Sequence, residues 1–150
     1  RSAAGATSLR LMLLLDTNVV SAMLGVSREP RVRACLAEQH DPLLVTASVC
    51  QAELWAGIAT MPEGRRRQLL EQAVHTFFAE EFYECVLPFD EPAAFAYAEI
   101  FAARRSAGRP GATTDLMIAA IARVHGARVV TRNVRDFEGC GVPVSNPWDP

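Results

Sequence analysis

Three acidic residues stand at positions where metal-dependent chemistry could be carried out. Asp16 directly follows the apolar run 12–15, and Glu53 and Asp115 each lie near the start of a helix-like segment rich in apolar residues. An unpaired carboxylate beside a hydrophobic core is costly unless a cation or hydrogen-bond donors accompany it. Each acid taken alone has a simpler interpretation: Asp16 and Asp115 could stabilise the start of a helix, and Glu53 could be solvated.

Taken together, the three carboxylates favour a shared metal ion. If each lies at the strand-end side of a β–α unit, their charges repel one another strongly unless a cation sits between them. Oxygen ligands without Cys or His select a hard ion such as Mg²⁺ or Mn²⁺. Such an ion lowers the pKa of a bound water and neutralises charge on a phosphoryl group, which implies phosphodiester hydrolysis. The sequence therefore predicts a metal-dependent nuclease with Asp16, Glu53 and Asp115 as catalytic metal ligands.

A polar segment, 131–138, is expected to reach the same edge of the sheet as these acids. Asn133 is the residue best placed there to add a fourth contact, through its amide oxygen or through a bridging water. Asp136 is the acidic alternative, although its position before Phe137 favours a loop-capping role. Which of the two residues completes the site stays open.

The elements that would position these residues alternate between strands and helices. The expected strands are 12–15, 43–46, 83–87, 127–130 and 142–144, and the expected helices are 17–24, 31–39, 49–59, 63–78, 93–105 and 115–125. Ser48 and Gln51 have the spacing of a capping box, and Thr113 or Thr114 is expected to cap the last helix. This alternation predicts an α/β fold with a mostly parallel sheet and helices on both faces, because parallel neighbours need crossover helices. In such sheets, ligands collect beyond the carboxyl ends of the strands.

Length and composition place the chain among single-domain proteins. With 150 residues, half of them apolar, it can bury a core without disulfides. No apolar run reaches the roughly 18 to 20 residues of a membrane span, so we expect a soluble, cytoplasmic protein with no membrane partner. The four cysteines show no CxxC pair or zinc-ligand spacing, which favours buried free thiols. We interpret residues 1–11 as an expression-derived or disordered leader and residues 12–150 as the folded domain.

The charge of the chain argues against a surface that coats nucleic acid indiscriminately. The formal net charge is −2, and all 15 basic residues are arginines. Arg65 to Arg67 form one cluster, and Arg104, Arg105 and Arg109 form another. Local patches of this kind can bind phosphate even when the total charge is negative.

Five segments together carry a resemblance to a known family. They are LLDTNVVSAML, AELWAGI, TDLMIAAIA, VVTRNVRDF and the terminal NPW, and they span essentially residues 12–148. They resemble the PIN-domain ribonucleases of bacterial type II toxin–antitoxin systems, the VapC group and in particular its FitB-like branch. The resemblance implies a sheet in the order 3-2-1-4-5, dependence on Mg²⁺ or Mn²⁺, cleavage of tRNA or another structured RNA, and inhibition by a cognate VapB-like or FitA-like antitoxin.

The resemblance also implies roles for particular residues and partners. By motif, Asp16, Glu53 and Asp115 fall on the three acidic positions of the family. The fourth position, often Asp in the family, is Asn133 here, so the metal count, one ion or two, stays open. Thr17 and Asn18 are accessory candidates that would hydrogen-bond near the metal or the substrate.

Partners follow from the same likeness. A homodimer is expected through apolar helices, on which Trp55, Phe95 and Tyr97 look exposed, and DNA would be contacted only through the antitoxin. The antitoxin is expected to cover the acidic pocket, with an arginine that mimics the metal. The main alternative is a non-catalytic module whose acids only cap helices and which acts by pairing with an antitoxin on DNA. No P-loop, GxGxxG or GxSxG motif supports another hydrolase or phosphotransferase.

Overall fold

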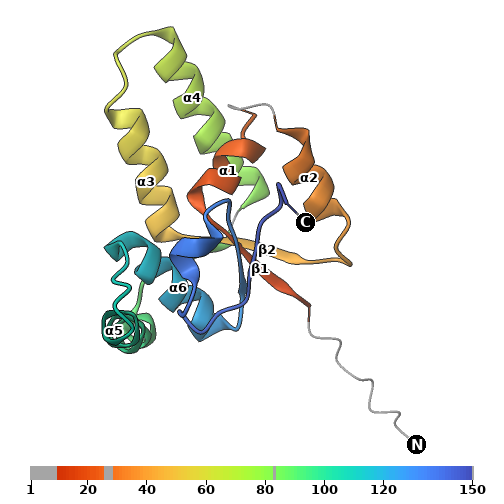
Figure 1. The fold of residues 1–150 in the computed structure, drawn as a ribbon. Helices are drawn as coiled ribbons and strands as arrows, with labels where there is room; N and C mark the ends of the chain where they lie inside the picture. Colours follow the sequence, from red (N-terminus) through yellow and green to blue (C-terminus); the bar gives the residue numbers. More distant parts are fainter. Residues whose placement is uncertain (1–9, 26–28, 83, 150) are drawn as a thin grey trace, which may run out of the picture.

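The central feature of the computed structural model, which describes residues 10–25, 29–82 and 84–149, is a parallel sheet covered by helices on both faces (Figure 1). The strands are β1 (Met12–Leu15), β2 (Leu43–Ala47), β3 (Val86–Leu87), β4 (Arg128–Val130) and β5 (Val144–Ser145). The helices are α1 (Thr17–Met23), α2 (Pro30–Ala37), α3 (Ser48–Ala59), α4 (Arg65–Thr76), α5 (Glu91–Ser106) and α6 (Thr113–His125). All pairings are parallel, in the order β3-β2-β1-β4-β5, so the expected fold class and strand order are confirmed.

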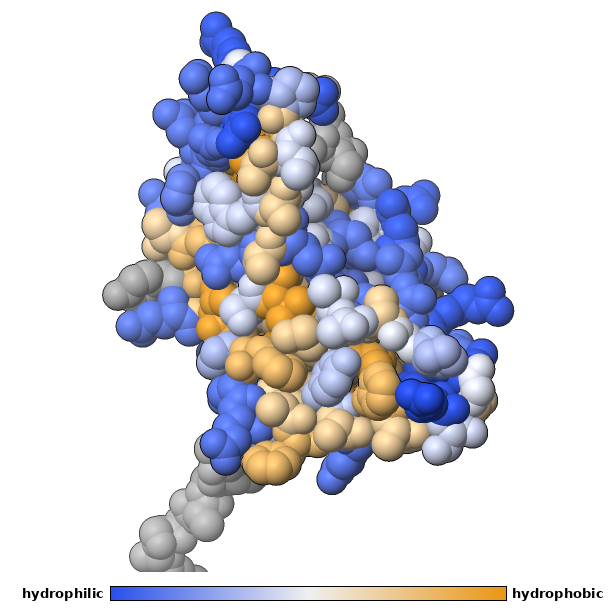
Figure 2. Space-filling view, turned by 90° about the vertical axis from the view of Figure 1, so that its left-hand side faces the viewer, coloured by the Kyte–Doolittle hydropathy of each residue, from blue (hydrophilic) through white to orange (hydrophobic). Residues whose placement is uncertain are grey.

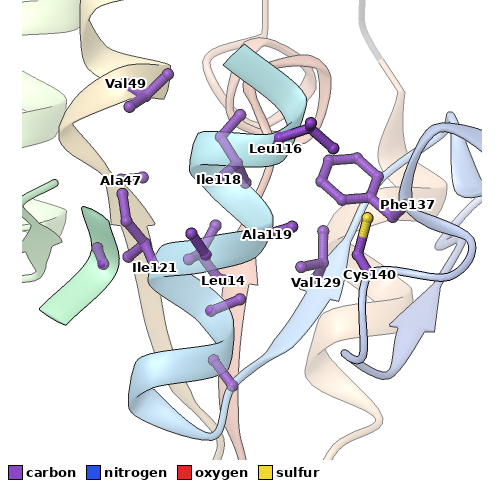
Figure 3. Packing of buried hydrophobic residues seen from close by; sticks show 14 of the residues in the cluster. Leu14, Ala47, Val49, Leu116, Ile118, Ala119, Ile121, Val129, Phe137 and Cys140 are labelled. Atoms are coloured by element: carbon purple, nitrogen blue, oxygen red, sulfur yellow. The ribbon is translucent and has the colours of Figure 1, made fainter. Parts of the chain in front are cut away.

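The leucines of β1 divide between two hydrophobic cores. Leu14 and Val129 pack against α6, next to Ala119, in a cluster that also takes in α3 and α5 (Figure 3). Leu13 and Leu15 face the opposite side, where α1 and α2 cover the sheet. Because helices cover both faces, a central parallel strand is apolar at every position, which explains why β1 reads as an unbroken run ending at an acid.

The helix α6 is the most deeply buried helix of the larger core. Its residues from Ile118 to Ala122 are fully buried under the sheet. Gly126 ends the helix in the left-handed conformation, at a φ of 63°, and the chain then enters β4 directly. Asp115, in the first turn of α6, is thereby brought to the edge of the sheet where β1 and β4 end.

The predicted capping box at the start of α3 does not form. The strand β2 runs through Ala47, which pairs with Leu87, so Ser48 is already the first helical residue. Ala47 is the capping residue, and it makes no side-chain hydrogen bond. The prediction from Ser48 and Gln51 is therefore wrong, because the strand passes into the helix without an intervening loop residue.

The predicted cap of α6 is wrong for a similar reason. Ala112 is the capping residue, and its carbonyl oxygen accepts from the backbone N–H of Leu116 at 3.1 Å. Thr113 and Thr114 consequently lie inside the first turn of the helix. The cap of α5 is a side chain, since Asp90 accepts from the backbone N–H of Ala93 at 3.2 Å.

Several boundaries differ from those expected. A single π-helical turn, η1 (Phe77–Glu81), follows α4. A 3₁₀ helix, η2 (Val134–Phe137), lies within the expected loop 131–138, and β5 begins two residues later than predicted. Tyr83, the expected start of the third strand, and residues 1–9 of the expected leader lie outside the described residues. All four cysteines are free thiols, as predicted, but only Cys50 and Cys140 are buried, while Cys35 and Cys85 are partly exposed. In the described ranges, no helix has the length and apolarity to cross a membrane.

The pair α3 and α4 extends away from the sheet as two adjacent helices (Figure 1). The rings of Trp55 on α3 and His75 on α4 lie 4.5 Å apart between centroids, which joins the two helices. This contact leaves Trp55 only partly exposed. Tyr97 on α5 is also partly exposed, whereas Phe95 is 68% exposed. Of the three residues expected to be exposed, only Phe95 is.

Candidate metal centre

Asp16 is buried at the carboxyl end of β1, with 5% of its surface exposed. One carboxylate oxygen accepts from the backbone N–H of Thr17 at 2.8 Å, so Asp16 caps α1. The other oxygen accepts from the hydroxyl of Thr131 at 2.8 Å. An ionised carboxylate has about four acceptor positions, so the cap does not exclude a bound cation.

The pKa of the Asp16 carboxyl is raised by burial, which disfavours its charged form. The hydrogen bonds from Thr131 and Thr17 lower this pKa but do not offset the burial, and the negative charge of Asp136 raises it further. The hydrogen-bond donors around Asp16 therefore do not fully compensate its negative charge.

Glu53 lies on the second turn of α3 with its side chain exposed. Its Oε1 accepts from the hydroxyl of Thr17 at 2.9 Å. Thr17 therefore contacts two of the predicted acids, Asp16 through its backbone and Glu53 through its side chain. The start of α1 thus links the acid at the end of β1 to the acid on α3, the helix that follows β2.

Asp115 is partly buried in the first turn of α6, and its pKa is raised to about 6. Burial is the largest cause, followed by the negative charges of Asp136, Asp16 and Glu53, while Arg104 acts in the opposite direction. The carboxylates are thus close enough for each to penalise the ionisation of Asp115. Neighbouring carboxylates that raise a pKa in this way are typical of sites that bind a cation.

Asp136 and Asn133 take different positions relative to these acids. Asp136 lies in η2, and its charge raises the pKa of both Asp16 and Asp115. Asn133 precedes η2 and makes no capping hydrogen bond with its side chain, while its backbone N–H donates to the hydroxyl of Thr131 at 3.0 Å. No hydrogen bond of the Asp136 side chain is found within the described chain, so the loop-capping role expected for it has no support in the geometry.

Thr131 is a site residue whose importance the sequence did not reveal. It is fully buried, and its hydroxyl donates to Asp16 while it accepts from Asn133 at 3.0 Å and from the side-chain amide of Asn18 at 3.5 Å. One donor and two acceptor positions exhaust what a hydroxyl can offer. Its only signal in the sequence is a threonine directly after a buried strand.

Arg104 is a buried cation beside the acids that the sequence analysis counted only as part of a surface cluster. It is 7% exposed, and its guanidinium donates to the backbone carbonyl of Glu138. Its charge lowers the pKa of Asp115. None of the ion pairs found among the described residues includes Asp16, Glu53, Asp115 or Asp136, so this compensation is incomplete.

The arrangement does not amount to a formed metal site. Within residues 10–25, 29–82 and 84–149, no three side chains of Asp, Glu, His or Cys are placed to hold one ion. The shared metal site of Asp16, Glu53 and Asp115 therefore stays a prediction. The donor set nevertheless consists of carboxylate oxygens, which suit a hard divalent cation.

Comparison with protein families identifies the domain. A profile described as the PIN domain matches residues 13–139. The plasmid stability protein StbB of Pseudomonas syringae pv. tomato is 40% identical over 140 residues, covering 92% of this chain and 99% of that protein. The VapC ribonuclease Y4jK of Sinorhizobium fredii is 34% identical, covering 93% and 99%, and the toxin FitB of Neisseria gonorrhoeae is 35% identical, covering 91% and 99%.

A solved structure agrees with these relatives in fold and length. The structure of FitAB bound to an IR36 DNA fragment contains a chain that superposes with a TM-score of 0.84 at 34% identity. The match covers 93% of this chain and 97% of that one. The similarity thus extends over nearly the whole chain, including the edge of the sheet at which the acids lie.

Proposed function

The chain belongs to the PIN-domain family, in its VapC and FitB toxin group, and from this we propose that it is a metal-dependent endoribonuclease, the toxin of a type II toxin–antitoxin system. The observation that carries the proposal is the set of carboxylates at the carboxyl edge of the sheet, whose charges raise the pKa of Asp16 and Asp115 and which have no ion-pair partner among the described residues. Carboxylate oxygens without such partners suit a hard divalent cation.

We assign the divalent cation, Mg²⁺ or Mn²⁺, to Asp16, Glu53 and Asp115. Asp136 is better supported than Asn133 as the fourth metal contact, because the charge of Asp136 raises the pKa of both Asp16 and Asp115. When bound, the ion would lower the pKa of a coordinated water and neutralise charge on the scissile phosphate.

The chain's own residues hold the acids in place for this reaction. Thr131 fixes one oxygen of Asp16, and Thr17 fixes the other through its backbone while holding Glu53 through its hydroxyl. Asn18 supports the arrangement by donating to Thr131. We therefore propose that Thr17 and Asn18, expected as accessory residues, orient the acidic side chains. Asp115 is positioned by the start of the buried helix α6.

The substrate that we propose is RNA, in tRNA or another structured form. Support comes from the VapC ribonuclease among the relatives and from a cleft of about 670 Å³ that opens next to Asp136. Asn133, Asn146 and two cations, Arg132 and Arg135, are among the residues lining this cleft, so hydrogen-bond donors and positive charge lie beside Asp136. The bacterial cytoplasm, where such RNA is found, is the compartment that we propose.

A cognate antitoxin of the VapB or FitA type is the proposed inhibitory partner, with DNA contacted only through it. A groove of about 220 Å³ adjoins Glu53 and is lined by apolar residues of α3 and α4, including Leu54, Ile58 and Leu70. Its shape and lining suit an apolar segment, and the neighbouring acids suit a cationic side chain. An antitoxin arginine in contact with Glu53 would inhibit by replacing the metal.

Homodimerisation through the region of α5 is also proposed. Viewed from the side on which α5 lies, apolar side chains gather over the lower part of the molecule (Figure 2). Phe95 and Phe101 on α5 are 68% and 42% exposed, and Val124 on α6 is 40% exposed. Exposed aromatic residues of this kind are typical of interfaces between copies.

Sequencing of RNA 5′ ends after expression tests the proposed activity and its substrate. Wild-type protein should create new 5′ ends at defined positions, and Asp16→Ala should create none. Unaltered cleavage by Asp16→Ala and by Asp115→Asn would overturn the site assignment. Absence of cleavage by the wild type, with intact binding to an antitoxin and its DNA, would favour the non-catalytic alternative.

A further inference from the structure

Arg132 follows the buried Thr131, and its side chain contacts both the residue before α2 and the C-terminal tail. One nitrogen of its guanidinium donates to both carboxylate oxygens of Glu29, at 3.0 and 2.8 Å. The guanidinium carbon lies 4.1 Å from the ring centroid of Trp148, in a cation–π contact. Glu29 immediately precedes α2, and Trp148 lies in the C-terminal tail, so Arg132 joins both to the end of β4.

The backbone of Arg132 is held from both sides as well. Its N–H donates to Oδ1 of Asn18 at 3.2 Å, and its carbonyl oxygen accepts from Nδ2 of Asn146 at 3.4 Å. Asn146 in turn accepts from the backbone N–H of Trp148 at 2.9 Å. The C-terminal tail therefore folds back on itself and fixes the same residue through backbone and side chain together.

Hydrogen bonds connect Arg132 to the acidic site. The same Asn18 that receives the Arg132 N–H donates to Thr131, whose hydroxyl holds Asp16. On the other side, η2 begins two residues after Arg132 and carries Asp136. The Arg132 backbone is therefore connected to the group that orients Asp16 and to the segment that bears Asp136.

We propose that Glu29, Arg132 and Trp148 form a clasp that positions the turn between β4 and η2, and that Arg132 is a positioning residue in the proposed nuclease and not a contact to RNA phosphate. This rests on the proposed function for its catalytic consequence. The guanidinium of Arg132 lines the cleft next to Asp136, but it is paired with Glu29 and stacked on Trp148, and these contacts fix its orientation. Arg135, which pairs with no acid within the described ranges, remains available for that purpose.

Amide hydrogen exchange tests the clasp without relying on activity. Trp148→Ala should speed exchange at the N–H groups of Arg132 and Asn133 by about 10-fold or more, and Trp148→Phe, which keeps an aromatic face, should restore most of the protection. Glu29→Gln should have a smaller effect in the same direction. The matched control is Glu99→Gln, which removes a comparable exposed ion pair, Glu99 with Arg123 at 3.0 Å, on the far helices α5 and α6.

Kinetics and metal binding then test the consequence for the site. Trp148→Ala should lower kcat about 10-fold and weaken Mn²⁺ binding, measured by titration calorimetry, with KM for RNA unchanged. Arg132→Lys should behave similarly, because lysine cannot stack and pair as the planar guanidinium does. If Arg132→Lys instead raises KM at constant kcat, Arg132 contacts substrate and the proposal is overturned.

The outcomes separate the clasp from the proposed function. Unchanged exchange at Arg132 and Asn133 in folded Trp148→Ala overturns the clasp, whatever the activity. Should that variant not fold, the same comparison is made between Trp148→Phe, Glu29→Gln and the wild type. A wild type that neither binds Mn²⁺ nor cleaves RNA overturns the proposed function, while the exchange result still decides the clasp.

Discussion

Replacing Asp115 with Asn should stabilise the metal-free protein at pH 8, although it removes a residue of the proposed active site. Burial and the charges of Asp136, Asp16 and Glu53 raise the pKa of Asp115 from 3.8 to about 6. A carboxyl group with a higher pKa in the folded than in the unfolded state binds its proton more tightly when folded. Its ionised form therefore opposes folding, and neutral Asn does not.

The magnitude follows from the size of that shift. A shift of about two pKa units corresponds to roughly 3 kcal/mol at about 1.36 kcal/mol per unit. Because Asp115 is only partly buried, solvent screens part of this, and we expect a gain of about 1–2 kcal/mol in the free energy of unfolding. Well below the unfolded pKa of 3.8 the residue is protonated in both states, so the gain vanishes there; it develops between pH 4 and 6 and is constant above.

Urea unfolding in the presence of EDTA, at intervals from pH 4 to pH 8, measures this difference. The control is Glu99→Gln, which also removes one carboxylate from the same pair of packed helices but stands in an exposed ion pair with Arg123. Its effect on the free energy of unfolding should be small. A loss of stability for Asp115→Asn at pH 8, or a difference that is independent of pH, would refute the electrostatic reasoning.

Three further predictions concern the Thr131 hydroxyl, the buried thiol of Cys50 and the exposed ring of Phe95. Thr131→Val removes the hydroxyl that donates to Asp16 and should cost about 1–3 kcal/mol in the free energy of unfolding measured with urea, whereas Thr131→Ser should lose little; equal losses would show that the hydroxyl is not responsible. Cys50, buried and with its pKa raised to about 12, should resist iodoacetamide at pH 8 until urea is added, as judged by mass spectrometry; modification at the rate of the partly exposed Cys35 would contradict its burial. Phe95→Asp should yield monomers in sedimentation at micromolar concentrations where the wild type dimerises, and a monomeric wild type would exclude the dimer.

The fold could be predicted from local patterns because its determinants are local. The run of leucines in β1 indicates a strand buried on both faces, and Asp16 marks its end. Gly126 adopts the left-handed conformation that ends α6, as its position after the apolar run predicts. The strand order came from a family resemblance, since no pattern within the strands encodes which neighbours pair.

The candidate site was only partly predictable, because its decisive contacts join distant residues. The hydrogen bond from Thr131 to Asp16 spans 115 positions. The position of Thr131 after a buried strand does not by itself indicate which side chain its hydroxyl contacts. The burial of Arg104 depends on how the loop around Glu138 folds over it, while its neighbours suggested a solvated cluster. The choice between Asn133 and Asp136 depends on the 3₁₀ turn of η2, which the polar composition of that segment does not predict.

Cleavage of a structured RNA by the purified protein, with Mn²⁺ added or removed, tests the central claim most directly. The account predicts cleavage by the wild type with Mn²⁺, none in EDTA, and recovery when Mn²⁺ is restored. In the presence of Mn²⁺, Asp115→Asn should lose at least about 100-fold of the wild-type activity while remaining folded by circular dichroism. Cleavage that persists in EDTA, or that survives the Asp115→Asn substitution, would contradict the assignment of the acidic edge of the sheet as a metal-dependent ribonuclease site.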